Sequence, residues 1–177
     1  MQDIELEQAI EMLLAHTAPV SDTEEVSLLD AMGRVAAEEL RAGFDNPPFD
    51  RSPLDGYTFA ASSTRTATAE RPVALRVIAE ECAGDFFAGQ VGAGECVRIM
   101  TGGAIPKGCD CVVRQEDVRE DGDTILVPFT SEPYENYCYA GEDIKQGTVL
   151  IRRGQRITAA HLAVLASEGY GAVRVYR

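Results

Sequence analysis

The chain has 177 residues, of which 45% are hydrophobic, so it can bury a substantial core in one large domain or two small ones. Its formal net charge is −13, which argues against a non-specific nucleic-acid-binding surface because such a surface needs a basic face. The chain has no long apolar run that could span a membrane, and its acidic start lacks the pattern of a secretory signal, so we expect a cytoplasmic protein.

The charge is distributed unevenly along the chain. Residues 1–50 carry 12 acidic and two basic side chains, whereas residues 145–177 carry one acidic and six basic side chains. Two interpretations are open: the chain ends pack together through opposite charge, or they form separate solvated faces.

Cysteine and histidine could build a redox or metal site, but their pattern does not favour one. The odd number of five cysteines and the expected compartment favour free thiols. Cys109-Asp-Cys111 lacks the CxxC spacing, and on a strand its cysteines would share one face as small buried hydrophobic residues. Only His16 and His161 are present, both in helix-like segments, so we expect neither zinc binding nor histidine catalysis.

The N-terminal part begins with a pattern typical of an amphipathic helix. Over residues 3–15 the apolar residues recur at spacings of three and four: Leu6, Ala9, Ile10, Leu13 and Leu14. The sequence SLLD at 27–30 resembles a capping box, which predicts a short helix that ends near Gly33. The next stretch, RVAAEELRA, is compatible with a helix or a strand.

The region from about residue 70 to residue 151 has short β-rich runs separated by turn residues. The predicted strands are 73–79, 96–100, 111–115, 124–129 and 148–152. Beyond them, Thr158 is expected to cap a helix over 159–168 that ends at Gly169, and AVRVYR closes the chain as a strand.

The order of these elements predicts an α+β fold with two domains. Helices lie towards both chain ends and β structure lies between them. We therefore expect a β-rich, mostly antiparallel domain over 45–140, inserted into a helical and mixed domain that is built from 1–44 and 141–177.

The stretch NPPFDRSPLDGYTF (46–59) combines three prolines with Asp50 and Asp55. Proline fixes φ and biases the preceding residue towards extended conformations, so this loop has little conformational entropy left to lose. Such a loop suits a site that holds a polar ligand or a metal in fixed geometry. The alternative is a hairpin connection, with an Asp55-Gly56 turn, whose aspartates bond only their own backbone.

The stretch RIMTGGAIPKGCDCVVRQED (98–117) carries a glycine-rich turn at 101–103. Paired glycines let a backbone approach a ligand closely and can present N–H groups to an anion. The turn is not a Walker loop, because Cys109 and Asp110 stand where lysine and serine or threonine are required. A plain hairpin turn explains the glycines equally well.

A third polar stretch, AGEDIKQGTVLIRRG (140–154), places Glu142 and Asp143 after a glycine. Adjacent carboxylates could bind Mg²⁺, which usually takes one or two of them and keeps several waters. Solvated turn residues are the alternative. The sequence contains no readable Ser-His-Asp or Cys-His grouping.

The three stretches occur together, in this order, in one protein family. PPFDRSPLDGY is similar to the motif P-F-D-N-S-x-M-D-G-Y, and VRIMTGGAIPKGCDCVVRQED to V-R-I-M-T-G-x-x-x-P-x-G-A-D-A-V-V-x-Q-E-D. GEDIKQGTVLIRRG is similar to G-E-D-I-x-x-G-x-x-L-x-x-G. Over nearly its whole length, the chain resembles the N-terminal region of the MoeA molybdopterin molybdotransferase family, which includes the C-terminal part of gephyrin.

The resemblance implies a cytoplasmic homodimer that inserts molybdate into adenylylated molybdopterin with Mg²⁺. It also implies a molybdopterin adenylyltransferase as a partner protein. Members of the family have four domains, and their active cleft lies between the third domain of one subunit and the second domain of the other. The chain resembles the first two domains, so we expect a fragment that is inactive alone.

By motif position, the resemblance implies functional roles for Asp55, Thr101 and Asp143. We expect these residues to position Mg²⁺, molybdate or terminal pterin atoms, and not to act as covalent nucleophiles. Asp55 and Asp143, together with Glu142, are the predicted metal ligands.

Two further roles follow from the same motifs. Gly102 and Gly103 are the predicted cofactor-binding residues. Asp50, nearer the prolines, is expected to hold the loop in shape.

One departure from the family pattern bears on the function. The family often has N-V-R where this chain has Asn136-Tyr-Cys138, so an arginine is missing, and Arg51, which replaces an asparagine, is the residue that could compensate. The missing arginine supports an alternative function, a non-catalytic scaffold or interaction module that keeps the fold.

Overall fold

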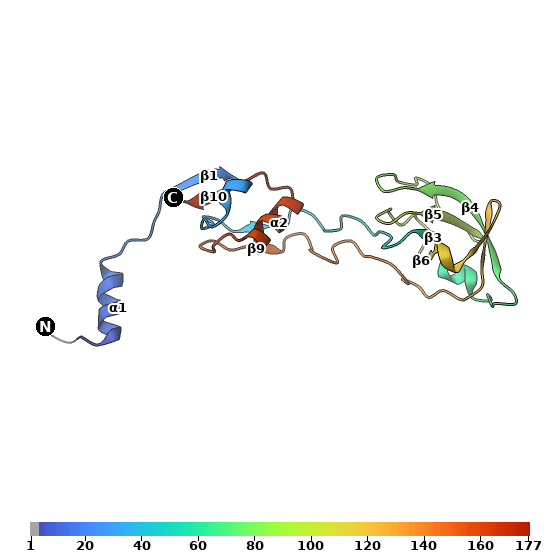
Figure 1. Ribbon diagram of the computed structural model, residues 1–177, viewed down its shortest axis with the longest axis horizontal. Helices are drawn as coiled ribbons and strands as arrows, with labels where there is room; N and C mark the ends of the chain where they lie inside the picture. Colours follow the sequence, from blue (N-terminus) through green and yellow to red (C-terminus); the bar gives the residue numbers. More distant parts are fainter. Residues whose placement is uncertain (1–3) are drawn as a thin grey trace. The chain divides into compact units, whose positions relative to one another are not determined.

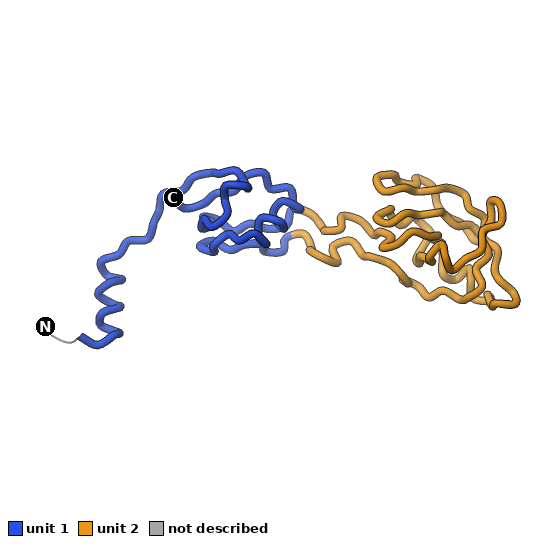
Figure 2. The backbone as a smooth tube through the Cα atoms, viewed as in Figure 1, with its two compact units in different colours: residues 1–43, 147–177 blue, residues 44–146 orange. Residues whose placement is uncertain are grey.

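The computed structural model describes residues 4–177, which form two compact units (Figure 2). Unit 1 joins the two chain ends, Met1–Gly43 and Gly147–Arg177, and unit 2 is Phe44–Gln146. Residues 141–146, which the sequence assigned to the first domain, bond within unit 2: the N–H of Gly141 donates to the Pro47 carbonyl (2.9 Å) and that of Ile144 to Asn46 (3.0 Å).

Two short antiparallel pairs of strands connect the chain ends in unit 1 (Figure 1). β1 (Thr23–Ser27) pairs with β10 (Ala172–Tyr176), and β2 (Leu40–Arg41) pairs with β9 (Val149–Ile151). They enclose a core of buried side chains: Leu28, Ala31, Ala36, Leu40, Ile151, Ile157, Leu165, Val173 and Val175. An ion pair of 3.8 Å joins Arg177 to Glu24, so the prediction that the ends pack together with opposite charges in contact is confirmed.

The predicted N-terminal helix is present as α1 (Leu6–Ala15), and residue 3 lies outside the described part of the chain. No side chain caps its N-terminus and none of its residues is buried. Its large apolar side chains are exposed instead: Leu6, Ile10, Met12, Leu13 and Leu14. The sequence pattern therefore predicted the helix correctly, while its apolar stripe finds no cover within residues 4–177.

The two other predicted helices match the structure to different degrees. The predicted short helix is present at Leu28–Ala31 as a 3₁₀ helix, η1, and the Ser27 hydroxyl caps it by accepting from the Leu29 N–H (3.3 Å), but the predicted capping box with Asp30 is wrong. α2 (Ala159–Ser167) begins at Thr158, whose cap is a true capping box with His161 as the reciprocal side chain. Gly169 follows with φ of +82°, as a helix stop requires.

Unit 2 is built on a six-stranded sheet with the order β6-β3-β5-β4-β8-β7. The strands are β3 (Gly56–Phe59), β4 (Val73–Glu81), β5 (Glu95–Ile99), β6 (Cys111–Arg114), β7 (Arg119–Asp121) and β8 (Thr124–Val127), with 3₁₀ turns η2 (Ala61–Thr64) and η3 (Gln115–Asp117). Only β4 and β5 are parallel, so the prediction of a mostly antiparallel unit is confirmed.

The sheet curls until its edge strand β7 reaches β3. The Tyr57 hydroxyl of β3 donates to Glu120 Oε1 of β7 over 2.6 Å, although three strands separate them in the sheet. The curl encloses a second core: Tyr57, Phe59, Ala61, Leu75, Cys96, Cys111, Val113, Ile125 and Val127. No helix among residues 4–177 is long and apolar enough to cross a membrane.

All five cysteines are free thiols, as predicted. Cys111 is buried on β6, but Cys109 lies in the loop before that strand, so the prediction that both share one strand face is wrong. Burial raises the pKa of both thiols to about 12, which makes them poor nucleophiles and metal ligands near neutral pH.

Candidate functional site

The three polar stretches meet at one end of the sheet in unit 2. Residues 50–52 bond to both of the other stretches, and the Ala140 N–H of the third donates to Asp50 Oδ1 (2.8 Å). The backbone N–H groups of Arg51 and Cys138 each donate to the carbonyl of the other residue (2.9 and 3.1 Å). On the other side, the Ser52 N–H donates to the Gly103 carbonyl (2.9 Å), and Ser52 accepts from the Gly102 N–H (2.8 Å).

Asp55 and Thr101 form the most direct contact at this end of the sheet. Because β3 and β5 are antiparallel, with Gly56 opposite Ile99, the residue before β3 lies beside the turn after β5. Asp55 Oδ1 accepts from both the Thr101 N–H and the Thr101 hydroxyl, each at 2.7 Å. These two hydrogen bonds hold the pKa of the Asp55 carboxyl below its usual range, and the positive charge of Arg98 adds to the effect.

The other oxygen of Asp55 is free to interact outside the chain. Asp55 is exposed, and its Oδ2 accepts no hydrogen bond from residues 4–177. The Thr101 contacts fix the orientation of the carboxylate while this oxygen faces solvent. The arrangement suits a group that must hold a cation or a ligand N–H in a defined place.

Gly56 is needed for a reason that the sequence did not reveal. It is not part of a turn but the first residue of β3, where a Cβ would lie 1.8 Å from the carbonyl oxygen of Val113 on β6. The absence of a side chain lets β3 approach β6 closely. This packing fixes the start of β3 and with it the position of Asp55.

The backbone amides of Gly102 and Gly103 are used within the protein. The Gly102 N–H donates to Ser52, and the Gly103 N–H donates to the Met100 carbonyl (2.8 Å). These amides are therefore not available to an anion. Gly102 has φ of +86°, which favours glycine, and a Cβ on Gly103 would lie 2.8 Å from Ile99 Cγ1. The predicted binding role of the two glycines stays a prediction, and it could consist only in letting a ligand approach the backbone closely.

Asp50 holds the loop in shape, as predicted. Its carboxylate accepts from the Tyr137 hydroxyl (2.6 Å) and from the Ala140 N–H (2.8 Å). Both oxygens are therefore used to join the proline-rich loop to residues 137–140.

Asp143 lies next to the site of the missing family arginine. Its exposed carboxylate is 3.9 Å from the Arg51 guanidinium, and Arg51 is the direct backbone partner of Cys138. An arginine side chain is thus present on the segment paired with residue 138. This contact supports the compensation that the sequence indicated.

The predicted metal ligands do not form a cluster on their own. Across residues 4–177 no group of three or more His, Cys, Asp or Glu side chains could hold a metal ion. Glu142 Oε2 accepts from the Tyr139 N–H (3.2 Å) and closes its own turn. Asp55 still fits Mg²⁺ as a single exposed oxygen ligand, because this ion often takes one or two carboxylates and fills its shell with water and phosphate.

Two charged residues near the site escaped prediction. Glu81 at the end of β4 is buried, its Oε2 accepts from the Phe87 N–H (3.1 Å), and burial raises the pKa of its carboxyl. Arg98 on β5 has a buried Nε without a partner among residues 4–177. The sequence signal that could have identified both residues is their position as charged side chains within or close to apolar runs that were predicted to be strands.

Comparison with known proteins agrees with the fold. The family described as MoeA N-terminal region (domain I and II) matches residues 4–169, and the chain belongs to this family.

Its relatives carry names that refer to molybdenum. The chain is 32% identical to the molybdopterin molybdenumtransferase of Staphylococcus epidermidis, and the match covers 98% of this chain and 41% of that protein. It is 37% identical to the Bacillus subtilis protein of the same name, and that match covers 93% of this chain and 39% of the relative. A crystal structure of the molybdopterin biosynthesis MoeA protein of Pyrococcus horikoshii OT3 matches with a TM-score of 0.89 and 38% identity, over 96% of this chain and 45% of that one. The chain thus spans less than half the length of these relatives.

Proposed function

We propose that this chain acts as the N-terminal part of a molybdopterin molybdotransferase, which inserts molybdate into adenylylated molybdopterin. The observation that carries the proposal is the Asp55–Thr101 pair, in which a carboxylate is fixed by two hydrogen bonds of 2.7 Å while its second oxygen stays exposed. Family membership over residues 4–169 supports the reaction class.

In this proposal the chain's residues position reactants and do not bond to them covalently. Asp55 holds a ligand or cation at Oδ2, while the Thr101 contacts keep its carboxylate ionised and oriented. Asp143 and Arg51 form a second contact point, which offers one acceptor and one donor. Mg²⁺, when bound, would neutralise charge on phosphate and molybdate oxygens, with Asp55 and Asp143 as the candidate ligands.

The protein context of this activity is also proposed. We place the enzyme in the cytoplasm as a homodimer whose cleft is shared between subunits, with a molybdopterin adenylyltransferase as a partner that supplies the adenylylated substrate. The exposed apolar side chains of α1 support an association surface, because contiguous exposed apolar residues often mark interfaces.

The test uses the gene that encodes this chain, expressed at its natural length in a cell deficient in molybdate insertion. Wild type is expected to restore molybdoenzyme activity, and Asp55→Asn and Asp143→Asn to reduce purified Mg²⁺-dependent insertion at least about tenfold, the effect of losing a charged contact. The control is Asp121→Asn, an exposed acid outside the three stretches. Normal activity of both site variants contradicts the residue assignment.

The alternative function, a non-catalytic scaffold, predicts a different outcome of the same experiment. A scaffold would be expressed well and would fail to rescue the deficient cell, even as wild type. The contact between Arg51 and Asp143, at the position of the missing arginine, weighs against that alternative.

A further inference from the structure

A polar cavity of about 330 Å³ opens on the curled sheet, and two of its lining residues, the paired Tyr57 and Arg98, lie two residues after Asp55 and three before Thr101. Strands β3, β4, β5, β7 and β8 contribute to it, where β4 leaves β8 and pairs with β5. The register between β4 and β5 shifts between Val77 and Ala79, and this irregularity lies in the cavity wall. The volume lies within the range of small-molecule sites.

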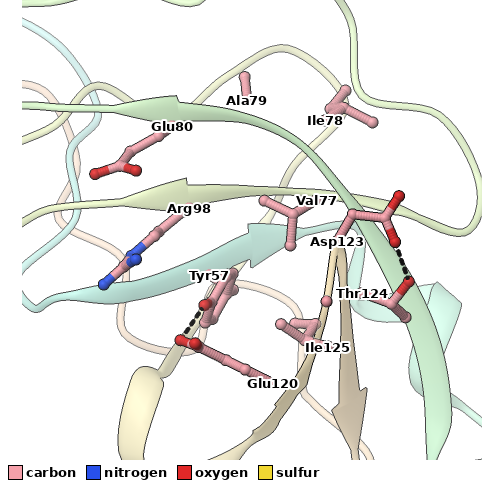
Figure 3. A pocket seen from close by; sticks show the side chains of 11 residues that line it. Tyr57, Val77, Ile78, Ala79, Glu80, Arg98, Glu120, Asp123, Thr124 and Ile125 are labelled. Atoms are coloured by element: carbon pink, nitrogen blue, oxygen red, sulfur yellow. Dashed lines mark hydrogen bonds between the residues drawn. The ribbon is translucent and has the colours of Figure 1, made fainter.

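The walls of the cavity separate apolar from polar groups (Figure 3). Val77 and Ile125 lie in the middle of the view, with Arg98 and Glu80 towards one end and Asp123 towards the other. Glu120 lies below Tyr57 in this view and accepts a hydrogen bond from the Tyr57 hydroxyl. A flat ligand could therefore rest on the partly exposed Val77, above the buried Ile125, and direct its edges to polar groups on both sides.

Arg98 is the donor that this cavity offers. Its Nε is buried and has no hydrogen-bond partner within residues 4–177, although a buried guanidinium nitrogen normally has one. The positive charge of Arg98 also acts on Asp55 and helps to lower the pKa of its carboxyl. An acceptor atom on a ligand would satisfy this nitrogen.

The acceptors are carboxylates held by neighbouring hydroxyl groups. Glu120 Oε1 accepts from Tyr57 (2.6 Å) and Asp123 Oδ1 from Thr124 (3.2 Å), so each carboxylate keeps its second oxygen for a ligand. Three acids against one arginine disfavour a bare anion as the occupant. A ligand with several N–H donors and at least one acceptor fits this set.

We propose that this cavity binds an amino-substituted nitrogen heterocycle, whose N–H edge bonds to Glu120 and whose acceptor bonds to Arg98. A pterin presents two adjacent N–H donors, its 2-amino group and N3–H, and an adenine presents its 6-amino group, so either ring can donate to the open oxygen of Glu120. The inference rests on the proposed function, because the proposed substrate, adenylylated molybdopterin, contains two amino-substituted rings that could be the ligand, a pterin and an adenine. The cavity would hold one of them next to Asp55.

The test is an NMR titration of the 177-residue chain with pterin and, separately, with AMP, without molybdate or Mg²⁺. Lumazine and IMP, which lack the amino group, are the matched probes. We expect saturable shifts of signals from Tyr57, Arg98 and Ile125 with pterin or AMP, and binding at least about tenfold weaker with the matched probes, since a lost hydrogen bond to a charged group costs this much. Shifts with one compound identify the ring; shifts with both support the shared chemistry.

Variants assign the binding to the cavity. Glu120→Gln and Arg98→Lys should each weaken binding at least about tenfold, the second because lysine lacks the planar donor array. Asp121→Asn, an exposed neighbour that does not line the cavity, should bind as wild type. Spectra of the unbound variants check that each is folded, and Arg98→Gln is the replacement if Arg98→Lys is not.

Two results overturn the inference: no binding of pterin or AMP, or binding that is unchanged in both cavity variants. Its failure is separable from that of the proposed function. If neither pterin nor AMP binds but the gene still rescues the deficient cell, only the ligand assignment of the cavity is rejected. If a ring binds but the gene does not rescue the cell, the proposed reaction is rejected.

Discussion

The two units of this chain differ in how they use the polar groups beside their strands. In unit 1 the Arg34 guanidinium bonds to both Glu24 (2.6 Å) and the Tyr176 carbonyl (2.8 Å), so its polar contacts fasten one chain end to the other. In unit 2 Asp55 bonds to Thr101 through one oxygen only, and Arg98 keeps a nitrogen without a partner in residues 4–177. Polar groups whose hydrogen bonds are all made within the protein stabilise the fold. Polar groups that are held in place but keep an unbonded donor or acceptor atom can bind a ligand.

The largest expected effect is on the unfolding free energy of unit 1, and it tests whether the two units unfold independently. Leu165→Ala removes a fully buried side chain from the core of unit 1 and should cost about 2–5 kcal/mol of unfolding free energy. Leu29→Ala, at an 84% exposed position of the same unit, should change it by less than about 0.5 kcal/mol. Urea unfolding followed by NMR signals from both units measures the effect. Because the two cores share no residue, equal loss in unit 2 would contradict their independence.

The second prediction concerns the close approach of β3 to β6 in unit 2. Gly56→Ala places a Cβ against the Val113 carbonyl and should destabilise unit 2 by an amount near the top of the overpacking range of about 1–3 kcal/mol. Gly171→Ala in unit 1, where nothing lies within 4 Å of the new Cβ, is the matched control. Similar melting temperatures of the two variants would show that the strand approach is not needed.

The third prediction is a pH dependence of unit 2 through Glu81. Burial raises the pKa of this carboxyl above its unfolded value of 4.5, so its favourable contribution is complete below pH 4.5 and is lost as the pH rises through the folded value. Glu81→Gln stays neutral and keeps an acceptor for the Phe87 N–H. The variant should match wild type at low pH and become progressively more stable than wild type towards pH 8, as measured by urea unfolding. A difference that is constant with pH would contradict the assignment.

The smallest effect concerns the polar pair itself. Thr101→Val removes the hydroxyl donor and keeps the backbone N–H, so the pKa of the Asp55 carboxyl should rise towards its ordinary value without returning fully. Carboxyl-carbon NMR titration measures the change. Thr124→Val, which removes a hydroxyl bonded to a different acid, should leave the titration of Asp55 unchanged. An unchanged pKa in Thr101→Val would mean that the hydroxyl contact is not formed in solution.

Sequence reasoning predicted the parts of this structure that depend on local pattern. The strand runs that became β4, β5, β6 and β8 were found because each is rich in β-branched or apolar residues. α2 was found because Thr158 and Gly169 mark its ends. The family motifs predicted functional roles for Asp55 and Thr101, and the structure adds the hydrogen bonds between them.

Local pattern failed where a partner strand decides the conformation. β3 is four residues long and follows a proline-rich loop, yet it is a central strand because β5 and β6 pair with it on both sides. β1 has two glutamates among its five residues, and it forms because β10 at the far end of the chain pairs with it. Such pairings join residues far apart in sequence, so no short window contains both members.

The sequence by itself determined the family, the free thiols, the ends of α2 and the identity of the polar loops. The tertiary structure decided what those loops do for one another: that Asp50 serves the loop while Asp55 keeps an exposed oxygen, that Arg51 lies against Cys138, and that Arg98 is left with an unused donor. The physical reason is that hydrogen-bond saturation and burial are properties of a place in the fold. A residue type states which bonds are available, and only its neighbours in space determine which of them remain open.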